Sequence, residues 1–280
     1  MVDPSQDLRD RIAAASGVQE SPDKIWFHKT AAAVIDAGRC VQCGTCLAAC
    51  PSQSIGLATD GLPTLIRMCT GCSACWDFCP LGGLRVERLQ RRWEVAIGDG
   101  ASVGAREVVG MVRSAYEARA REGIPGAQDG GVVTALVVAL LDQRYIQGAL
   151  LSHKQGPLRG QSVLATTPEQ VRQGAGSVFD QTYPLAELAA GLPPGVEEIV
   201  LVGTPCQVSG LRALQLFPWR YRKTPAGRVR LTIALFCTRS FDPNRLTLEL
   251  VRQRLDLGRT AKVDIRDGLF RAYDAAGEIV

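Results

Sequence analysis

Long apolar runs are missing from this sequence. Its most apolar segment, residues 130–141, is much shorter than the roughly 20 residues that a transmembrane helix needs. The opening residues, MVDPSQDLRDRIAAASG, are polar and lack the apolar stretch of a secretory signal peptide. We therefore expect a cytoplasmic protein, either free or bound peripherally to a membrane complex.

A strong excess of positive charge is also missing, because the formal net charge is only +4. This balance argues against nucleic acid as a partner, since nucleic-acid-binding domains usually carry a marked basic excess. The hydrophobic content of 46% and the length of 280 residues are sufficient for a small module followed by a medium-sized domain.

Cysteine, in contrast, is abundant, and eight of the ten cysteines lie in two short clusters. Such clustering suits a metal cofactor in a reducing compartment better than the disulfides of a secreted protein. Each cluster follows the pattern C-x2-C-x2-C-x3-C-P of bacterial ferredoxins that hold two 4Fe-4S clusters. The ligands predicted in this way are Cys40, Cys43, Cys46 and Cys50, followed by Pro51, and Cys69, Cys72, Cys75 and Cys79, followed by Pro80.

The spacing also predicts that the two ligand sets are crossed. Three cysteines of each motif surround one cluster, whereas the fourth, set apart by three residues and followed by proline, reaches the other cluster. Structural zinc also uses C-x2-C pairs, but it needs only four ligands per ion, commonly as two separated pairs. We therefore predict two 4Fe-4S clusters, one held by Cys40, Cys43, Cys46 and Cys79 and the other by Cys69, Cys72, Cys75 and Cys50.

The order of segments predicts an α+β chain in which a ferredoxin-like module precedes an α/β domain. Residues 1–37 are either a docking extension or a helix that packs on its own protein, and residues 38–86 are the ferredoxin domain, without room for regular helices. Residues 87–107 are a linker, and residues 108–280 are the second domain.

Strands and helices alternate in the second domain. Strands are predicted at 108–118, 149–152, 199–202 and 230–236, helices at 184–190, 206–216 and 243–255, a glycine loop with a helix at 126–141, and a hairpin at 263–280.

Two places in this domain are suited to a ligand. Gln128, Asp129, Gly130 and Gly131 form a loop before a helix, where backbone N–H groups and the positive end of the helix dipole can approach an anion. Such a loop is also typical of a tight turn without a ligand. The second place is the junction of a strand and a helix at 203–205, where open α/β sheets bind ligands.

Several segments together resemble the beta subunit family of coenzyme F420-reducing hydrogenases and dehydrogenases. They are GAQDGGVVTALVVALL (126–141), AGSVFDQTYPLAEL (175–188), LVGTPCQVSGLRAL (201–214), ALFCTRSF (234–241) and VDIRDGLF (263–270), preceded by the ferredoxin motifs. The resemblance covers most of the chain from about Arg39 onward. It implies that the α/β domain binds FAD and passes electrons between the iron-sulfur clusters and a small acceptor, which is F420 in some members and a tetrapyrrole in others.

The resemblance also implies where the flavin is bound. We expect contacts at Gln128, Asp129, Gly130, Gly131, Thr134, Ser152, His153, Gly203, Thr204 and Pro205. His153 has an alternative interpretation as an ordinary loop histidine. No catalytic residue can be named from the sequence.

Cys206 and Cys237 follow two strands and are predicted to converge at one edge of the sheet. In the family such cysteines help to hold a further 4Fe-4S cluster, together with a C-x2-C pair further along the chain. No such pair occurs up to Val280, so we expect a domain shortened at its C-terminal end, with a third cluster that another subunit would have to complete. Two buried thiols are the equal alternative.

The leading hypothesis is an oxidoreductase subunit in which FAD exchanges a hydride with F420 and the ferredoxin module passes single electrons to a redox partner, such as a hydrogenase, dehydrogenase or reductase subunit, or ferredoxin. The alternatives are a non-catalytic electron-relay subunit of a larger complex and a ferredoxin-dependent reductase of a tetrapyrrole.

Overall fold

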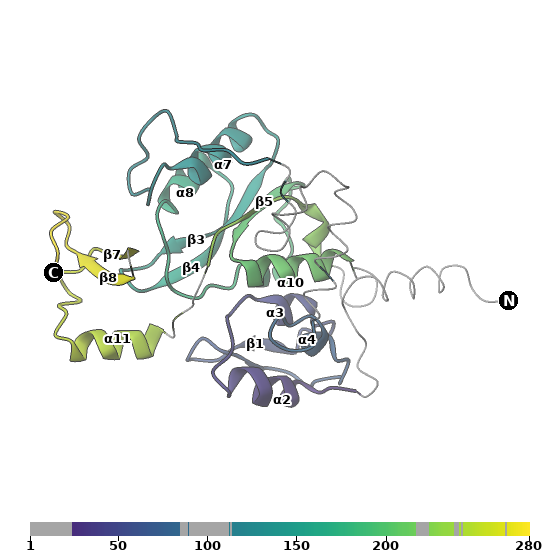
Figure 1. Cartoon of the computed structure of the whole chain (residues 1–280). Coiled ribbons are helices and arrows are strands. Elements are labelled where there is room, and N and C mark those ends of the chain that lie inside the picture. The colour runs from purple at the N-terminus through teal and green to yellow at the C-terminus, as the bar shows by residue number, and fades with distance from the viewer. Residues whose placement is uncertain are drawn as a thin grey trace. The chain divides into compact units, whose positions relative to one another are not determined.

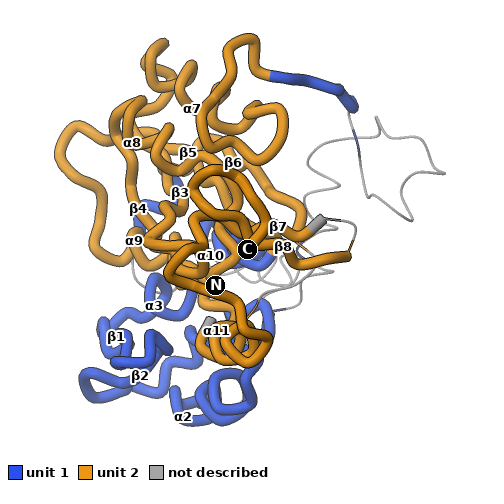
Figure 2. Tube along the Cα trace, turned by 90° about the vertical axis from the view of Figure 1, so that its left-hand side faces the viewer, with its two compact units in different colours: residues 1–40, 45–119, 206–227 blue, residues 41–44, 120–205, 228–280 orange. Residues whose placement is uncertain are grey.

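The computed structural model describes residues 24–84, 89, 112, 114–216, 224–237, 241, 243–266 and 268–280. The predicted linker 87–107, apart from Leu89, and the predicted extension before residue 24 lie outside the described residues. The chain divides into two compact units, coloured separately in Figure 2. The first comprises residues 1–40, 45–119 and 206–227, and the second comprises 41–44, 120–205 and 228–280.

The first unit is built from very short elements. They are α2 (Phe27–Thr30), the π-helical turn η1 (Ala31–Ile35), α3 (Thr45–Ala49), β1 (Ile55–Leu57), β2 (Pro63–Leu65) and α4 (Ala74–Asp77). The expectation that the cysteine-rich segment has no room for regular helices is therefore wrong, although α3 and α4 span only five and four residues. Strands β1 and β2 pair antiparallel, with Ile55 opposite Leu65.

The aromatic residue Phe27 belongs to the core of this unit. Its side chain is 5% exposed and packs in one cluster with Cys50, Ile55 and Cys75. Helix α2 therefore packs on its own protein, as one of the two interpretations of this segment expected.

The second unit contains a mixed four-stranded sheet in the order β4-β3-β5-β6. Its strands are β3 (Gly148–Lys154), β4 (Gly160–Ala165), β5 (Ile199–Gly203) and β6 (Val229–Ala234), the last preceded by the 3-10 turn η2 (Pro225–Arg228). Strands β3, β5 and β6 are parallel to one another, and β4 is antiparallel to β3. Because the parallel strands end at one edge, residues after Lys154 and Gly203 lie at the edge where such sheets bind ligands.

Helices α7 (Val132–Asp142) and α8 (Pro168–Gln173) lie side by side and cover the sheet (Figure 1). Val137 of α7 and Val171 of α8 pack with Ala149 and Leu151 of β3 in one core. Helix α9 (Pro184–Ala190) contacts β3 and β4, and helix α10 (Pro205–Leu216) follows β5 directly. These helices bring the loops before α7 and before α9 to the ends of the strands.

A smaller core holds the C-terminal elements of the second unit. It forms between α11 (Pro243–Arg252) and the hairpin of β7 (Lys262–Arg266) and β8 (Leu269–Tyr273), where Val263 and Ala272 are buried with Leu158. Among the helices of the described ranges, none has both the length and the apolar character to cross a membrane.

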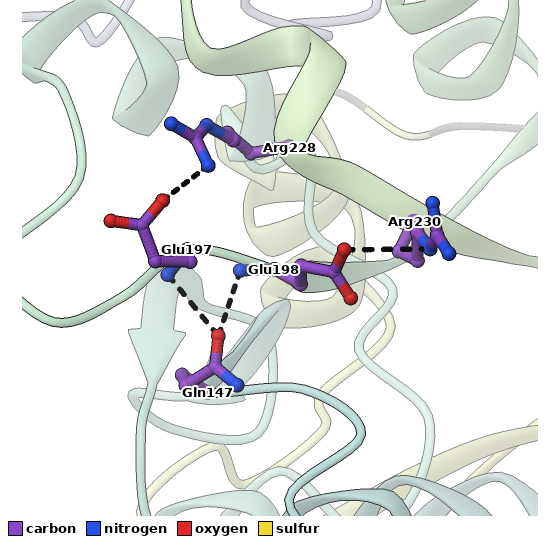
Figure 3. Close-up of polar contacts among 5 residues, drawn as sticks. All are labelled: Gln147, Glu197, Glu198, Arg228 and Arg230. Atoms are coloured by element: carbon purple, nitrogen blue, oxygen red, sulfur yellow. Dashed lines mark hydrogen bonds and ion pairs between the residues drawn. The ribbon is translucent and has the colours of Figure 1, made fainter.

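Side chains fix the opposite end of the sheet, at the starts of β5 and β6 (Figure 3). The Oε1 of Gln147 accepts hydrogen bonds from the backbone N–H groups of Glu197 (3.2 Å) and Glu198 (2.8 Å). The two glutamates pair in turn with Arg228 and Arg230, which flank the start of β6. This cluster joins the segments before β3, β5 and β6, and so helps to hold the three parallel strands together.

Most predicted elements of the second domain are confirmed. The helix after the glycine loop is α7, the predicted helix 184–190 is α9, and the predicted strands 149–152, 199–202 and 230–236 correspond to β3, β5 and β6. The predicted helices 206–216 and 243–255 are α10 and α11, and the C-terminal hairpin is present. The strand predicted at 108–118 is wrong over 114–118, which is exposed and without regular structure, while 108–111 and 113 lie outside the described residues.

Candidate functional site

Four cysteines line one pocket of the first unit. They are Cys50, Cys69, Cys72 and Cys75, the crossed set predicted from the spacing. The pocket is partly open to solvent, and Ile25, Phe27, Ile55 and Leu65 form apolar parts of its wall. Cys50 and Cys75 are buried, whereas Cys72 is exposed. The folding of this unit thus brings the last cysteine of the first motif to three cysteines of the second.

Electrostatics confirms that these four thiols are neighbours. Burial raises the pKa of the Cys75 thiol to about 12; the hydroxyl of Thr30 lowers it, and the nearby Cys72, Cys69 and Cys50 raise it further. A buried thiol that faces other thiols ionises only when a cation is bound, because ligation by a metal removes the proton. The donor set therefore fits an iron-sulfur cluster, which requires thiolate ligands.

Hydrogen-bond donors are directed at the sulfur atoms of this pocket. The backbone N–H of Ser54 donates to the Sγ of Cys50 (3.3 Å), and the backbone N–H of Gly71 donates to the Sγ of Cys69 (3.4 Å). The Oγ1 of Thr30 lies 3.4 Å from the Sγ of Cys75. Such bonds stabilise thiolate ligands and help to set the potential of a cluster.

The two motifs share an unusual backbone conformation on both sides of their second cysteine. In the first motif Gln42 and Gly44 have φ values of +50° and +84°, and in the second motif Gly71 and Ser73 have values of +68° and +65°. A positive φ reverses the direction of the chain locally and turns backbone N–H groups toward a common centre. This repetition supports the same ligand role for both motifs.

The other predicted set contains Cys40, Cys43, Cys46 and Cys79. The pKa of the Cys79 thiol is raised, mainly by burial and to a smaller extent by the nearby Cys206. The backbone N–H groups of Leu81 and Gly82 and the charge of Arg39 act in the opposite direction and lower this pKa. Cys206 is therefore close to Cys79 in the first unit. Because Cys43 lies in the segment 41–44 of the second unit, this ligand set stays a prediction.

All ten cysteines are free of disulfide bonds. Cys237 is exposed and belongs to the second unit, whereas Cys206 belongs to the first, so their convergence around a third cluster also stays a prediction. In the described ranges no three His, Cys, Asp or Glu side chains lie close enough together to hold a single metal ion.

The predicted glycine loop is an ordered turn before α7. Gly131, with φ of +70°, precedes the first helical residue and, being a glycine, supplies no side-chain cap to the N-terminal N–H groups of α7. The carbonyl of Gly130 accepts a hydrogen bond from the N–H of Ala120 (2.8 Å). The Oε1 of Gln128 is buried and has no hydrogen-bond partner among the described residues. A buried amide oxygen without a partner can accept a hydrogen bond from a water or from a ligand group.

Two further predicted flavin contacts, one in this loop and one in its helix, are at least partly accessible to solvent. Asp129 is exposed, and Thr134, in the first turn of α7, is partly buried. Both stay in the predicted flavin site, because the positive end of the α7 dipole favours an anionic group.

The end of β3 carries two more predicted contacts. The Oγ of Ser152 lies 2.7 Å from the Oγ1 of Thr182, in the loop before α9. The Nε2 of His153 lies 2.7 Å from the backbone carbonyl oxygen of Gln170 in α8, so this ring nitrogen already has a protein partner. This contact favours the alternative interpretation of His153 as an ordinary structural residue.

The junction after β5 lies at the same edge of the sheet, because β3 and β5 are parallel. Gly203 is buried, and its carbonyl accepts a hydrogen bond from the N–H of Leu235 (2.8 Å). Thr204 is partly buried, and Pro205 is exposed at the start of α10.

The loop between α8 and α9 is part of this edge, and the sequence interpretation missed it. A Cβ on Gly176 would lie 2.5 Å from the carbonyl oxygen of Gly126 and 2.7 Å from the Nζ of Lys154. The loop therefore lies against both the glycine loop and the last residue of β3. Glycines at 174 and 176 were the signal in the sequence that could have indicated a close backbone approach.

Comparisons with known proteins agree on one family. Residues 115–189 and 196–280 match the N-terminal and C-terminal parts of the family described as "Coenzyme F420 hydrogenase/dehydrogenase, beta subunit". Residues 33–86 match the 4Fe-4S dicluster domain. The family thus accounts for most of the second unit, and the dicluster domain accounts for both cysteine motifs.

Individual relatives are similar over parts of their length. The coenzyme F420-dependent sulfite reductase of Methanocaldococcus jannaschii is 30% identical over 86% of this chain, which spans 37% of that protein. The coenzyme F420 hydrogenase subunit beta of Methanosarcina barkeri is 30% identical over 57% of this chain, which spans 55% of that subunit. A chain in the structure of the F420-reducing [NiFe] hydrogenase complex from Methanosarcina barkeri superposes with a TM-score of 0.51 at 29% identity, covering 56% of this chain and 55% of that one.

Proposed function

Because the chain belongs to the coenzyme F420 hydrogenase/dehydrogenase beta subunit family, we propose that it is an iron-sulfur flavoprotein subunit that transfers electrons between 4Fe-4S clusters and coenzyme F420 through FAD. The observation that carries this proposal is the pocket lined by Cys50, Cys69, Cys72 and Cys75 in a chain of this family. The names of its relatives, an F420-dependent sulfite reductase and an F420 hydrogenase subunit, support F420 as the small acceptor or donor.

The residues of the first unit would hold the clusters. Cys50, Cys69, Cys72 and Cys75 supply four thiolates, and the N–H groups of Ser54 and Gly71 stabilise their negative charge. The opening at Cys72 is the place where electrons would reach a redox partner, because that ligand is exposed. The second set, Cys40, Cys43, Cys46 and Cys79, would hold the other cluster.

The residues at the sheet edge of the second unit would hold FAD. The loop of Gln128, Asp129, Gly130 and Gly131 would offer backbone N–H groups to an anionic group, and the buried Oε1 of Gln128 would accept a hydrogen bond from a hydroxyl or N–H group of the ligand. Ser152, held by Thr182, and the junction 203–205 lie at the ends of the neighbouring parallel strands. FAD supplies the conversion between hydride transfer and single-electron transfer when it is bound.

The proposal includes a partner subunit. The hydrogenase relative occurs in a complex, and this chain spans about half of that relative's length. We expect a hydrogenase, dehydrogenase or reductase subunit to bind near the exposed end of the ferredoxin unit. A cytoplasmic position, free or on a membrane complex, stays a prediction.

The test is anaerobic purification of the full chain, followed by iron and flavin analysis and assays with F420, NAD, ferredoxin and a tetrapyrrole. We expect about eight iron atoms and one FAD per chain, and reduction of F420 by a chemically reduced protein. The matched variant Cys50→Ala should lose about half of the iron and keep its flavin. A wild-type chain without flavin, or one that reduces only the tetrapyrrole, would contradict the proposal.

A non-catalytic electron relay is the second candidate. It is favoured by the relation to the sulfite reductase, of which this chain spans only 37%. If the purified chain holds clusters and flavin but turns over no small molecule, whereas a co-purifying subunit does, this second function is correct.

A further inference from the structure

Lys154 is the last residue of β3 and lies where two glycine-containing loops meet. Its Nζ would be 2.7 Å from a Cβ on Gly176, and the carbonyl oxygen of Gly126 would be 2.5 Å from the same position. Gly126 and Gly176 have φ values of +79° and +100°. The loop of Gly176 therefore packs directly against the backbone of Gly126 and the amine of Lys154, which places this amine beside both loops at the end of β3.

The ammonium group of Lys154 has no counter-charge. Among the described residues it forms neither an ion pair nor a hydrogen bond, and the residue is partly buried. Burial, and secondarily the charge of Lys262, lowers its pKa. A partly desolvated ammonium next to a second cation is unfavourable by itself, and an anion between them would offset that cost.

The surroundings of Lys154 do not supply that anion. Lys262, the first residue of β7, also lacks an ion pair among the described residues. The carboxylate of Asp180, in the loop before α9, accepts hydrogen bonds from the backbone N–H groups of Gly160 and Gln181, each at 2.8 Å. Asp129 of the glycine loop is exposed to solvent. A negatively charged ligand is the remaining way to balance the two lysines.

A second observation indicates a missing ligand in the same region. The glycine loop that contains Gly126 also contains Gln128, whose buried Oε1 has no partner among the described residues. This oxygen is an acceptor, so a hydroxyl or N–H group of a ligand that binds beside Lys154 would satisfy it. The amide oxygen of Gln128 and the ammonium group of Lys154 are thus two polar groups without a partner among the described residues, one in the glycine loop and one beside it.

We propose that Lys154 binds a phosphate group of the ligand at the end of β3, beside the loops of Gly126 and Gly176, with Lys262 adding a second positive charge. The inference rests on the proposed function only in that FAD and F420 are the expected carriers of this phosphate. A phosphate group matches the site because its anionic oxygens accept charge-assisted hydrogen bonds from a lysine and from backbone N–H groups at once. Lys154 is therefore a binding residue for the cofactor or substrate, in addition to those expected from the sequence.

The experiment measures binding to the full chain, purified anaerobically with its clusters. FAD, FMN, riboflavin, F420 and inorganic pyrophosphate are titrated by calorimetry, and the flavins also by fluorescence quenching. The variant Lys154→Met keeps the apolar stem of the side chain and removes its charge. Lys29→Ala, an exposed lysine of α2 in the other unit, is the charge-matched control.

We expect Lys154→Met to weaken the binding of at least one phosphate-bearing ligand by about ten- to a hundredfold, as for loss of one charged hydrogen bond. The binding of riboflavin, which lacks phosphate, should not change, and Lys29→Ala should not affect any ligand. A loss for FAD assigns the phosphate to the flavin, and a loss for F420 assigns it to the substrate. Equal weakening of FAD and riboflavin, or no weakening of any ligand, would overturn the inference.

The same titrations separate this inference from the proposed function. If the wild-type chain binds no flavin and no F420, the proposed function fails, and Lys154-dependent binding of pyrophosphate still upholds the phosphate site. If pyrophosphate does not bind either, the site is wrong as well. If flavin binds with unchanged affinity to Lys154→Met, the proposed function survives and only the role of Lys154 is lost.

Discussion

The hydroxyl of Thr30 lies 3.4 Å from the sulfur of Cys75, although the two residues are 45 positions apart. Both side chains are buried, so this contact joins α2 to the predicted cluster ligands of the second motif. A hydrogen bond to a ligand sulfur stabilises the more negative, reduced cluster. The helix before the first motif therefore takes part in tuning the second.

The first prediction concerns Thr30→Val, which keeps the shape of the side chain and removes the hydroxyl. The reduction potential of the cluster should become more negative by roughly 20–60 mV, the equivalent of one hydrogen bond for a one-electron couple. A titration followed by electron paramagnetic resonance measures the shift. Thr70→Val is the control, because Thr70 lines the same pocket without a hydrogen bond to sulfur among the described residues. Equal shifts in both variants would refute the role of the contact.

The second prediction compares two glycines of the first unit. Gly71 and Gly61 both have a positive φ, of +68° and +78°, but a Cβ on Gly71 would lie 2.9 Å from the Trp26 ring, whereas a Cβ on Gly61 has nothing within 4 Å. Gly71→Ala should therefore lose one cluster, about four of eight iron atoms per chain, and Gly61→Ala should keep both. Iron analysis decides, and full iron content in Gly71→Ala would show that the loop adapts.

The third prediction tests the crossed ligand sets with two double variants. Cys50→Ala with Cys69→Ala removes two ligands of one predicted cluster and should leave about four iron atoms. Cys50→Ala with Cys46→Ala removes one ligand from each cluster and should leave almost none. An uncrossed arrangement reverses the two results, so the iron content alone distinguishes them.

The fourth prediction concerns removal of iron. Two of the four buried members of the core around Phe27 are cysteines, Cys50 and Cys75, so this core depends on what the thiols bind. After chelation under oxidising conditions, backbone amides of α2 and α4 should exchange with deuterium much faster. The amides of Leu150 and Leu201, in fully buried parts of the other unit's sheet, should remain protected. Loss of protection in both units together would mean that they unfold as one.

Much of the second unit could be predicted from the sequence because its signals are local. Apolar runs such as Ile199–Gly203 and a proline at the start of α9 each identify one element without reference to the rest of the chain. Helix α8 had an equally local signal that was overlooked. Thr167 and Gln170 form a capping box around Pro168, the usual start of a helix.

What could not be predicted depends on contacts between distant residues. Strand β4 is short and only two of its residues are buried, and its place beside β3 is set by pairing across the sheet. The place of Lys154 beside the loops of Gly126 and Gly176 could not be predicted, because these glycines are far from it in sequence. The cysteine pocket is the opposite case, since the chemistry of iron-sulfur ligation fixes the spacing in the sequence itself.

The last prediction addresses the polar cluster at the start of the sheet (Figure 3). Gln147→Ala leaves the backbone N–H groups of Glu197 and Glu198 without their acceptor and should lower the free energy of unfolding by roughly 1–3 kcal/mol. Arg228→Ala removes an ion pair whose side chains are 56% and 62% exposed, which costs at most about 1 kcal/mol. Urea unfolding of the two variants measures the difference. Because Gln147 accepts two backbone hydrogen bonds, one of them from the partly buried Glu198, and the exposed charges are already solvated, Gln147→Ala should be the more damaging change. The reverse order would show that the ion pairs hold β5 to β6.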